Sequence, residues 1–198
     1  MTGHAQLKLT RTAGFSLDVA FDIPEDGVTA LFGPSGCGKT TVLRCIAGLE
    51  KARGRVVVAG RLWQDDAAGI FVPTYARRLG YVFQEASLFD HLNVRQNLEY
   101  GMKRIRDADA AERLAHAVEL LGIGHLLDRR TNELSGGERQ RCAIARSLAV
   151  KPTILLMDEP LASLDNARRR EILPWLEKLR KELSIPILYV THSEEEVE

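Results

Sequence analysis

The residues with the clearest chemical potential form one segment, Gly33-Pro34-Ser35-Gly36-Cys37-Gly38-Lys39-Thr40. It fits the pattern G-x-x-x-x-G-K-[ST] at every specified position. Glycines let successive backbone N–H groups turn toward one point, where a following helix N-terminus adds its partial positive charge. Lys39 can then reach the outer phosphates of a nucleotide, and the Thr40 hydroxyl is placed to ligate Mg²⁺. We therefore predict a phosphate-binding loop rather than a glycine-rich turn that binds nothing.

A pair of carboxylates, Asp158 and Glu159, follows the continuous apolar run at 154–157. Such a run is expected for a strand buried on both faces of a parallel sheet. Ligands bind at the carboxyl ends of such strands, so Asp158 is a candidate to coordinate Mg²⁺. Glu159 could accept a proton from an attacking water. Two surface carboxylates at a strand end are the alternative, and the upstream phosphate loop favours the functional interpretation.

A third segment, Leu134-Ser135-Gly136-Gly137-Glu138-Arg139-Gln140, opens another predicted helix. Ser135 and Glu138 form a capping box, S-x-x-E. That box does not explain two glycines in the first turn, where each costs roughly 1 kcal/mol relative to alanine. We expect a phosphate group to approach this helix N-terminus closely. The chain would then hold two half-sites, which a head-to-tail pair of chains could combine around two shared nucleotides.

Regular patterns elsewhere indicate the elements that must hold these residues. Alternation predicts half-buried antiparallel strands at 5–10 and 15–23, and further strands are expected at 28–32, 55–59, 81–83, 152–157 and 185–190. A polar loop that includes residues 64–66 should separate two of them. Residues 90–149 read as a largely helical block, and a charged helix containing Pro174 is expected at 166–183. The pattern predicts an α/β fold with an antiparallel β subdomain and an inserted helical subdomain.

Composition narrows the class of protein. The chain has 198 residues with 27 basic and 27 acidic side chains, so its net charge is zero, which argues against a nucleic-acid-coating protein. No apolar run approaches the roughly 18 residues of a membrane span, and the first residues lack a secretory-signal layout. The three cysteines have no metal-ligand spacing, which suits a reducing cytosol.

Together, residues 33–40, 134–140 and 154–159 resemble the Walker A, signature and Walker B motifs of ABC ATPases. Gln84 resembles the Q-loop glutamine of that family, residues 162–165 its D-loop and His192 its switch histidine. The resemblance implies a P-loop NTPase (RecA-like) core in one ABC ATPase domain, 1–198. Its core and β subdomain would be 1–89 and 150–198, and its helical subdomain 90–149. Family members continue past the switch histidine, so we expect the C-terminal end of the domain to be missing.

The resemblance also implies roles for individual residues in a homodimer that binds ATP and Mg²⁺. Lys39 would contact the β- and γ-phosphates, Glu159 would be the general base and His192 would read the γ-phosphate. Mg²⁺ would be organised by Thr40, Gln84 and Asp158. Each ATP would lie between two segments. One is residues 33–41 of one subunit, which end at Thr41, and the other is Leu134, Ser135, Gly136, Gly137 and Glu138 of the other subunit. Phe15 would either stack on adenine or pack in the core of its strand.

Within the family, residues 80–101 resemble the ATPases of molybdate importers, with sulfate and sugar importers as near neighbours. A soluble ABC ATPase is disfavoured, because the chain has neither a long coiled-coil insertion nor a second cassette. The resemblance implies a peripheral subunit at the cytoplasmic face of the inner membrane, with no nucleic-acid partner. Transmembrane permease subunits would dock in a groove near Gln84, Leu88 and Phe89. Packing of these apolar residues within the helical subdomain is the alternative.

Overall fold

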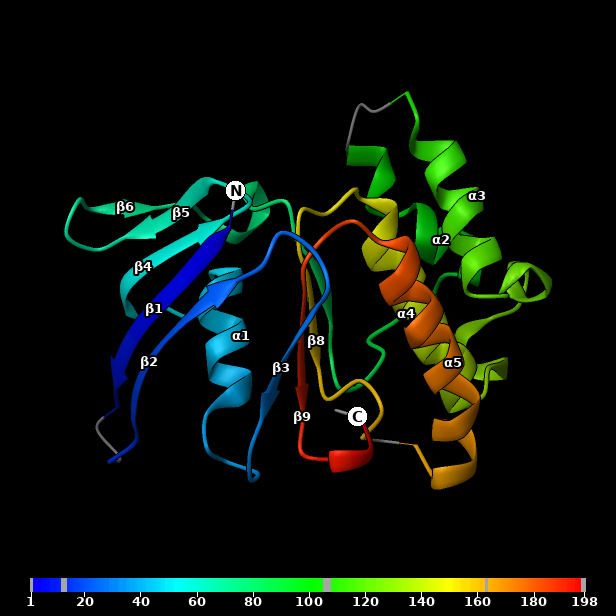
Figure 1. The fold of residues 1–198 in the computed structure, drawn as a ribbon. Helices are drawn as coiled ribbons and strands as arrows, with labels where there is room; N and C mark the ends of the chain where they lie inside the picture. Colours follow the sequence, from blue (N-terminus) through cyan, green and yellow to red (C-terminus); the bar gives the residue numbers. More distant parts are fainter. Residues whose placement is uncertain (1, 12–13, 105–107, 163, 197–198) are drawn as a thin grey trace.

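The computed structural model describes residues 2–11, 14–104, 108–162 and 164–196. An antiparallel sheet, helix α1, a parallel sheet and a group of helices follow one another from left to right across the molecule (Figure 1). Ser163, in the segment that resembles the D-loop, lies outside the described residues. Among the described residues, no helix is long and apolar enough to cross a membrane.

The antiparallel sheet is built mainly from the N-terminal third of the chain. Its order is β2-β1-β4-β5-β6, and its strands are β1 (Gly3–Thr10), β2 (Ser16–Ile23), β4 (Arg53–Val58), β5 (Arg61–Asp65) and β6 (Ile70–Phe71). Alternation along these strands buries one face, including Leu7, Leu17 and Val56. The predicted polar loop at 64–66 is wrong in part. Gln64 and Asp65 belong to β5, and Gln64 is only 2% exposed.

In the parallel sheet, the carboxyl ends of all four strands lie at the same edge. Its order is β3-β9-β8-β7, and its strands are β3 (Val28–Phe32), β9 (Ile187–Thr191), β8 (Leu155–Asp158) and β7 (Gly80–Val82). Every residue of β8 and β9 is buried, as a strand covered on both faces requires. Asp158 lies opposite Val190, and Phe32 lies opposite Thr191. The loops after β3, β8 and β9 therefore meet in space.

Helix α1 (Lys39–Ala47) lies between the two sheets (Figure 1). Its apolar side chains share one buried cluster with residues of both sheets, among them Leu7 and Val56 of the antiparallel sheet and Leu188 of the parallel sheet. The helix ends at Gly48, whose φ of 77° is a left-handed conformation that favours glycine. Because both sheets pack on it, α1 fixes the position of the loop from which it starts.

The remaining helices lie on the other side of the parallel sheet (Figure 1). They are α2 (Val94–Glu99), α3 (Ala110–Leu120), α4 (Gly136–Ala149) and α5 (Asn166–Glu182), which contains Pro174 as expected. Short 3₁₀ turns are η1 (Thr74–Ala76), η2 (Met102–Arg104), η3 (Gly124–Leu126), η4 (Thr131–Glu133) and η5 (Glu194–Glu196). A second buried cluster joins these helices to β7, β8 and β9. The predicted α/β fold class, with its antiparallel β subdomain and its helices, is confirmed.

One buried cation, Arg77, fastens the C-terminal end of α1 to the antiparallel sheet. It is 4% exposed and donates hydrogen bonds to the carbonyls of Cys45 and Ile46, which lie at the end of α1. Its guanidinium also lies over the rings of Trp63 and Phe71. Burial lowers the pKa of Arg77 to about 10, which leaves it charged at neutral pH. Arg77 thus donates to the helix-end carbonyl of Ile46 and adds a second donor to that of Cys45, which also accepts from the Gly48 N–H.

We predict that Arg77→Gln lowers the free energy of unfolding by about 3 kcal/mol, because it removes charged hydrogen bonds and leaves the Ile46 carbonyl without this donor. Urea unfolding followed by far-UV circular dichroism measures this loss. The neighbouring Arg78 has an exposed side chain, so Arg78→Gln is the matched control and should change stability by less than about 0.5 kcal/mol. Equal losses in the two variants would contradict the role given to Arg77.

Candidate nucleotide-binding site

A hydrogen bond between Thr40 and Asp158 lies at the centre of the candidate site. The Thr40 hydroxyl, in the first turn of α1, donates to Oδ1 of Asp158 at 2.7 Å. The Tyr81 hydroxyl donates to the other oxygen, Oδ2, at 3.2 Å. Burial raises the pKa of Asp158, and the hydrogen bonds from Thr40 and Tyr81 act in the opposite direction. The structure therefore brings together two residues that are 118 positions apart in the sequence.

The ammonium group of Lys39 lies against its own loop. Its Nζ donates to the carbonyl of Gly33 at 2.7 Å and to that of Pro34 at 3.0 Å. Glu159 Oε1 lies 3.9 Å from the same nitrogen. Lys39 is 8% exposed, so its charge is held in place at the mouth of the loop rather than extended into solvent. Phosphate oxygens could replace these carbonyls as its partners.

Glu159 and His192 form a pair beside Lys39. His192 Nδ1 lies 3.1 Å from Glu159 Oε2, although the two residues follow different strands, β8 and β9. Glu159 has a φ of 45°, a left-handed conformation that is strained for a side chain of this kind. Its backbone N–H donates to the carbonyl of Val190, which holds the residue in this conformation. The carboxylate is thereby held between Lys39 and the imidazole.

The loop itself requires glycine at Gly38. This residue has a φ of 107°, and a Cβ there would lie 2.9 Å from Cζ of Phe15. The Phe15 ring therefore lies against the phosphate loop as well as against the apolar cluster around α1. Both sequence interpretations of Phe15 are compatible with this position. Pro34, Ser35, Gly36 and Cys37 are exposed, whereas the Thr41 side chain is buried in the first turn of α1.

The segment 134–138 is formed as predicted at the start of α4. The Ser135 side chain accepts from the Glu138 N–H, and the Glu138 carboxylate accepts from the Ser135 N–H at 2.7 Å. This backbone hydrogen bond is the main reason that the pKa of Glu138 is lowered. Leu134 is 5% exposed and packs in the helical core, so its side chain does not face outward.

The two glycines of this segment have a packing reason that the sequence interpretation missed. A Cβ on Gly136 would lie 2.9 Å from Leu164, and one on Gly137 would lie 3.3 Å from Ile172. Glycine at both positions therefore leaves the ends of the Leu164 and Ile172 side chains undisturbed. Close approach of a phosphate is not needed to explain the glycines, and it stays a prediction.

Gln84 is exposed, and no interaction among the described residues joins it to the phosphate loop or to Asp158. Downstream of it, Asn97 is fully buried and organises the following loop. Its side chain accepts from the Phe89 N–H and donates to the carbonyls of Phe89, Leu92 and Asn93. The role of Asn97 could not be predicted from the sequence, because its hydrogen-bond partners are backbone groups whose positions depend on the folded loop.

The apolar residues near Gln84 are only partly covered. Leu88 packs against the helical core. Phe89 lies 4.5 Å from the Tyr100 ring between ring centroids, and the Arg146 guanidinium lies 5.1 Å from the Phe89 ring. Packing within the helical subdomain therefore accounts for part of these side chains, and the groove for the permease stays a prediction. A hollow of about 410 Å³ adjoins Leu88 and reaches Gly136 and Gln140 of α4.

The oxygen donors at the centre of the site fit Mg²⁺. Thr40 and Asp158 offer a hydroxyl and a carboxylate at hydrogen-bonding distance, and Mg²⁺ usually takes one or two carboxylates together with substrate phosphates and waters. No group of three or more His, Cys, Asp or Glu side chains in the described part of the chain could hold a metal ion by itself. A metal held by Thr40 and Asp158 would take its remaining ligands from phosphates and waters.

The strand, the glycine loop, α1 and the Thr40–Asp158 pair define a site of the P-loop class. A family profile described as ABC transporter matches residues 17–162. The chain belongs to the ABC transporter family. CbiO1 of Clostridium perfringens, described as part of the ABC transporter complex cbiONQ, has a similar solved structure. Its TM-score is 0.81, with 30% sequence identity over 97% of this chain and 78% of that one.

Several proteins named molybdenum import ATP-binding protein ModC are similar in sequence. That of Thiobacillus denitrificans is 66% identical over 93% of this chain and 51% of its own length. That of Pseudomonas fluorescens is 60% identical over 100% of this chain and 55% of its own length. The chain thus spans about half the length of the curated relatives that it matches.

The three thiols differ in accessibility, which gives a direct test of the site. Cys45 and Cys142 are fully buried, and burial raises their pKa values to about 11 and about 12, whereas Cys37 is exposed in the phosphate loop. Because the thiolate is the reactive form, we predict that Ellman's reagent modifies Cys37 alone in the folded chain and all three thiols after denaturation. Absorbance at neutral pH counts the modified thiols. The folded Cys37→Ser variant should not react, and rapid reaction of a second thiol would contradict the burial described.

Proposed function

We propose that the chain is the ATP-hydrolysing part of an ABC importer, which works as a head-to-tail dimer and drives uptake of an oxyanion, molybdate. The observation that supports this best is the cluster of Thr40, Asp158, Lys39, Glu159 and His192 at the carboxyl ends of the parallel strands. Family membership and the names of the similar proteins support the choice of reaction and solute.

In this proposal the phosphate loop, residues 33–41, binds the phosphates of ATP. Lys39 exchanges the carbonyls of Gly33 and Pro34 for oxygens of the β- and γ-phosphates. Thr40 and Asp158, with Gln84, hold Mg²⁺, which supplies positive charge to the phosphate oxygens. The ring of Phe15, beside Gly38, is available to stack on the adenine. These contacts position the terminal phosphate for attack by water.

Glu159 is the proposed general base. Its carboxylate accepts a proton from the attacking water, while His192, 3.1 Å away, orients it and contacts the γ-phosphate. The backbone of Glu159 is fixed by its hydrogen bond to Val190, and its carboxylate already lies beside His192 and Lys39. Hydrolysis then depends mostly on positioning and on charge stabilisation.

Residues 134–138 of a second subunit complete each site. The N-terminal end of α4 carries backbone N–H groups and a partial positive charge suited to a phosphate. Among the described residues, nothing connects this segment to the phosphate loop of the same chain. The proposed dimer accounts for both half-sites, with each subunit supplying one half to each of two nucleotides.

The transporter context adds permease subunits and a place in the cell. We assign the surface around Gln84, Leu88 and Phe89 to the permease, because the partly buried Leu88 lines a hollow there. The chain would then lie at the cytoplasmic face of the inner membrane without spanning it.

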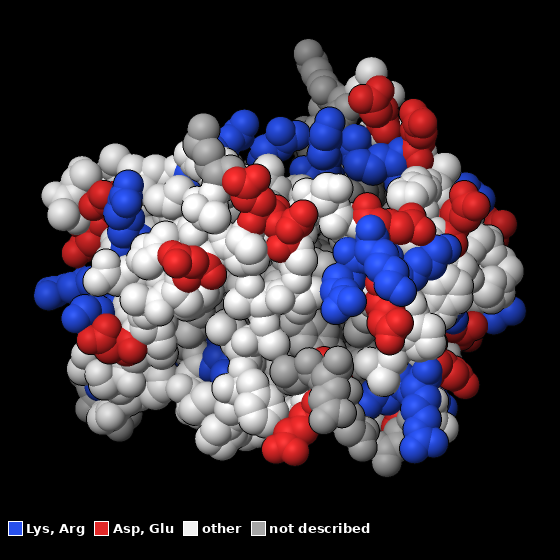
Figure 2. All heavy atoms as spheres, viewed as in Figure 1, with Lys and Arg blue, Asp and Glu red and all other residues white. Residues whose placement is uncertain are grey.

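The face seen in Figure 2 carries charges of both signs over the helices and few charges over its middle, without a large area of one sign.

The proposed activity predicts that Glu159→Gln lowers the rate of ATP hydrolysis by about 10³-fold, because a general base is lost, while ATP binding persists. Phosphate release measures the rate of hydrolysis in both proteins. Measured at several protein concentrations, it also tests the shared site, because the rate per subunit should rise with concentration if two subunits form each site. Glu112→Gln, on the exposed side of α3, is the matched control and should hydrolyse ATP normally. Hydrolysis by a species that stays monomeric at every concentration would contradict the shared site.

The permease assignment predicts that Phe89→Asp weakens binding to a detergent-solubilised molybdate permease by about tenfold or more, because a charge replaces an apolar contact. Co-purification at several concentrations measures the loss, and circular dichroism checks the fold. Tyr75→Asp is the control, because Tyr75 is 91% exposed and lies in η1, outside the proposed surface. Unchanged binding by a folded Phe89→Asp variant would place the contact elsewhere.

A further inference from the structure

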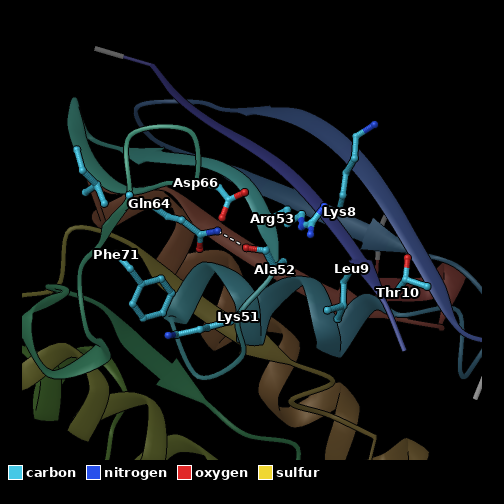
Figure 3. Close-up of a pocket in the computed structure, with 11 residues that line it drawn as sticks. Lys8, Leu9, Thr10, Lys51, Ala52, Arg53, Gln64, Asp66 and Phe71 are labelled. Carbon is cyan, nitrogen blue, oxygen red and sulfur yellow. Dashed lines mark hydrogen bonds between the residues drawn. The ribbon is translucent and has the colours of Figure 1, made fainter. Parts of the chain in front are cut away.

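The antiparallel sheet carries a hollow of about 760 Å³ that shares no residue with the candidate nucleotide-binding site (Figure 3). The cations Lys8, Lys51 and Arg53 line it, but Lys8 and Lys51 are directed away from Arg53. Lys8 also forms an ion pair with Asp18 at 2.9 Å. These side chains do not converge, as the polar groups of a binding site do. The edge of the parallel sheet differs, because two hydroxyl groups converge there on one carboxylate.

The carboxylate of Asp158 is held through both of its oxygens. Thr40 donates to Oδ1 at 2.7 Å, and the Tyr81 hydroxyl donates to Oδ2 at 3.2 Å. A carboxyl group turns easily about its last side-chain bond, because that torsion has broad minima. One hydrogen bond therefore leaves the carboxylate plane free to turn, and a donor on the other oxygen fixes it. Asp158 is only 7% exposed, so water provides little of this support.

Tyr81 is itself held in place by the sheet. It lies on β7 directly opposite Leu156 of β8, two residues before Asp158. Residues two apart on a strand point to the same face, so Tyr81, Leu156 and Asp158 all face α1. The Tyr81 ring packs in the cluster around α1, and its centroid lies 4.4 Å from that of the Phe83 ring. A phenol is protonated at neutral pH, so packing of the ring places a donor at Oδ2 of Asp158.

We propose that Tyr81 is a positioning residue for the metal of the candidate site, which holds the Asp158 carboxylate in the orientation that Mg²⁺ requires. This inference rests on the proposed function, in which Thr40 and Asp158 hold Mg²⁺. Of the two donors to Asp158, Thr40 is also a proposed ligand, whereas Tyr81 acts only through the carboxylate. Mg²⁺ demands nearly ideal octahedral geometry, so a carboxylate that can turn binds it less well.

Calorimetric titration of ADP, with saturating Mg²⁺ and again with EDTA, tests this role without any hydrolysis. The ratio of the two dissociation constants reports how strongly the metal and the nucleotide support each other's binding. Tyr81→Phe keeps the ring and removes only the hydroxyl. It should weaken ADP binding about tenfold in Mg²⁺, the loss expected for one hydrogen bond to a charged group, and leave binding in EDTA unchanged.

Asp158→Asn is the reference variant, because it removes the carboxylate itself. It should weaken ADP binding in Mg²⁺ at least as much as Tyr81→Phe does. Adding Tyr81→Phe to Asp158→Asn should cause no further loss, since a residue that acts through another is not additive with it. A further tenfold loss in the double variant would overturn the action of Tyr81 through Asp158.

Tyr189→Phe is the matched control. Tyr189 lies on β9 of the same sheet, is 6% exposed and donates its hydroxyl to Glu196 at 2.8 Å. This variant also loses a buried hydroxyl but leaves the donors to Asp158 in place, so its Mg²⁺ dependence should match that of the unmodified chain. Thermal unfolding followed by circular dichroism checks that all variants fold.

The remaining outcomes separate the role of Tyr81 from the proposed function. If Tyr81→Phe and the unmodified chain show the same Mg²⁺ dependence, the role of Tyr81 is overturned and the nucleotide site stands. Equal losses in Mg²⁺ and in EDTA would also overturn it, because they would show that the hydroxyl supports only the fold. Failure of the unmodified chain to bind ADP would overturn the proposed nucleotide site, and the role of Tyr81 with it.

Discussion

The hydrogen bond from Thr40 to Asp158 is the interaction on which the arrangement of the candidate site depends. It joins the first turn of a helix to the end of a strand across 118 positions of sequence. The bond requires that β8 lie beside β9, that β9 lie beside β3, and that α1 leave the loop after β3 at one angle. Each of these conditions is met by burial, since β8 and β9 are covered on both faces and α1 is covered by two sheets. The chemistry at the edge of the sheet is thus a consequence of how its middle is packed.

Helix α1 connects the candidate site to the antiparallel sheet. Its N-terminal end carries Lys39 and Thr40, and its C-terminal carbonyls are held by Arg77, which also contacts Trp63 and Phe71 in the antiparallel sheet. The antiparallel sheet therefore does more than cover one side of the helix. It fixes the position of α1 along the helix axis, and therefore also the position of the phosphate loop from which α1 starts.

Local patterns were sufficient to predict the elements that carry the phosphate loop, β8 and the start of α4, because their signals lie within a few neighbouring residues. Gln64 shows where such patterns fail. It reads as a loop residue by its polarity, but β4 and β6 on either side make it part of a strand. Tyr81 was predicted only as a strand residue, since its hydrogen bond to Asp158 depends on the pairing of β7 with β8. The sequence predicts that Gly136 and Gly137 make room for a phosphate. Their contacts with Leu164 and Ile172 could not be predicted, because these two residues lie outside the segment.

The left-handed backbone at Glu159 sets stability against the proposed function at a single residue. A side chain other than glycine, asparagine or aspartate in this conformation costs of order 1 kcal/mol or more. Glycine would remove that cost, and with it the carboxylate between Lys39 and His192. Selection for a more stable fold alone would therefore replace this residue, and so would a stability-based redesign of the sequence. The chain nevertheless carries a carboxylate at this strained position, as the proposed general base requires.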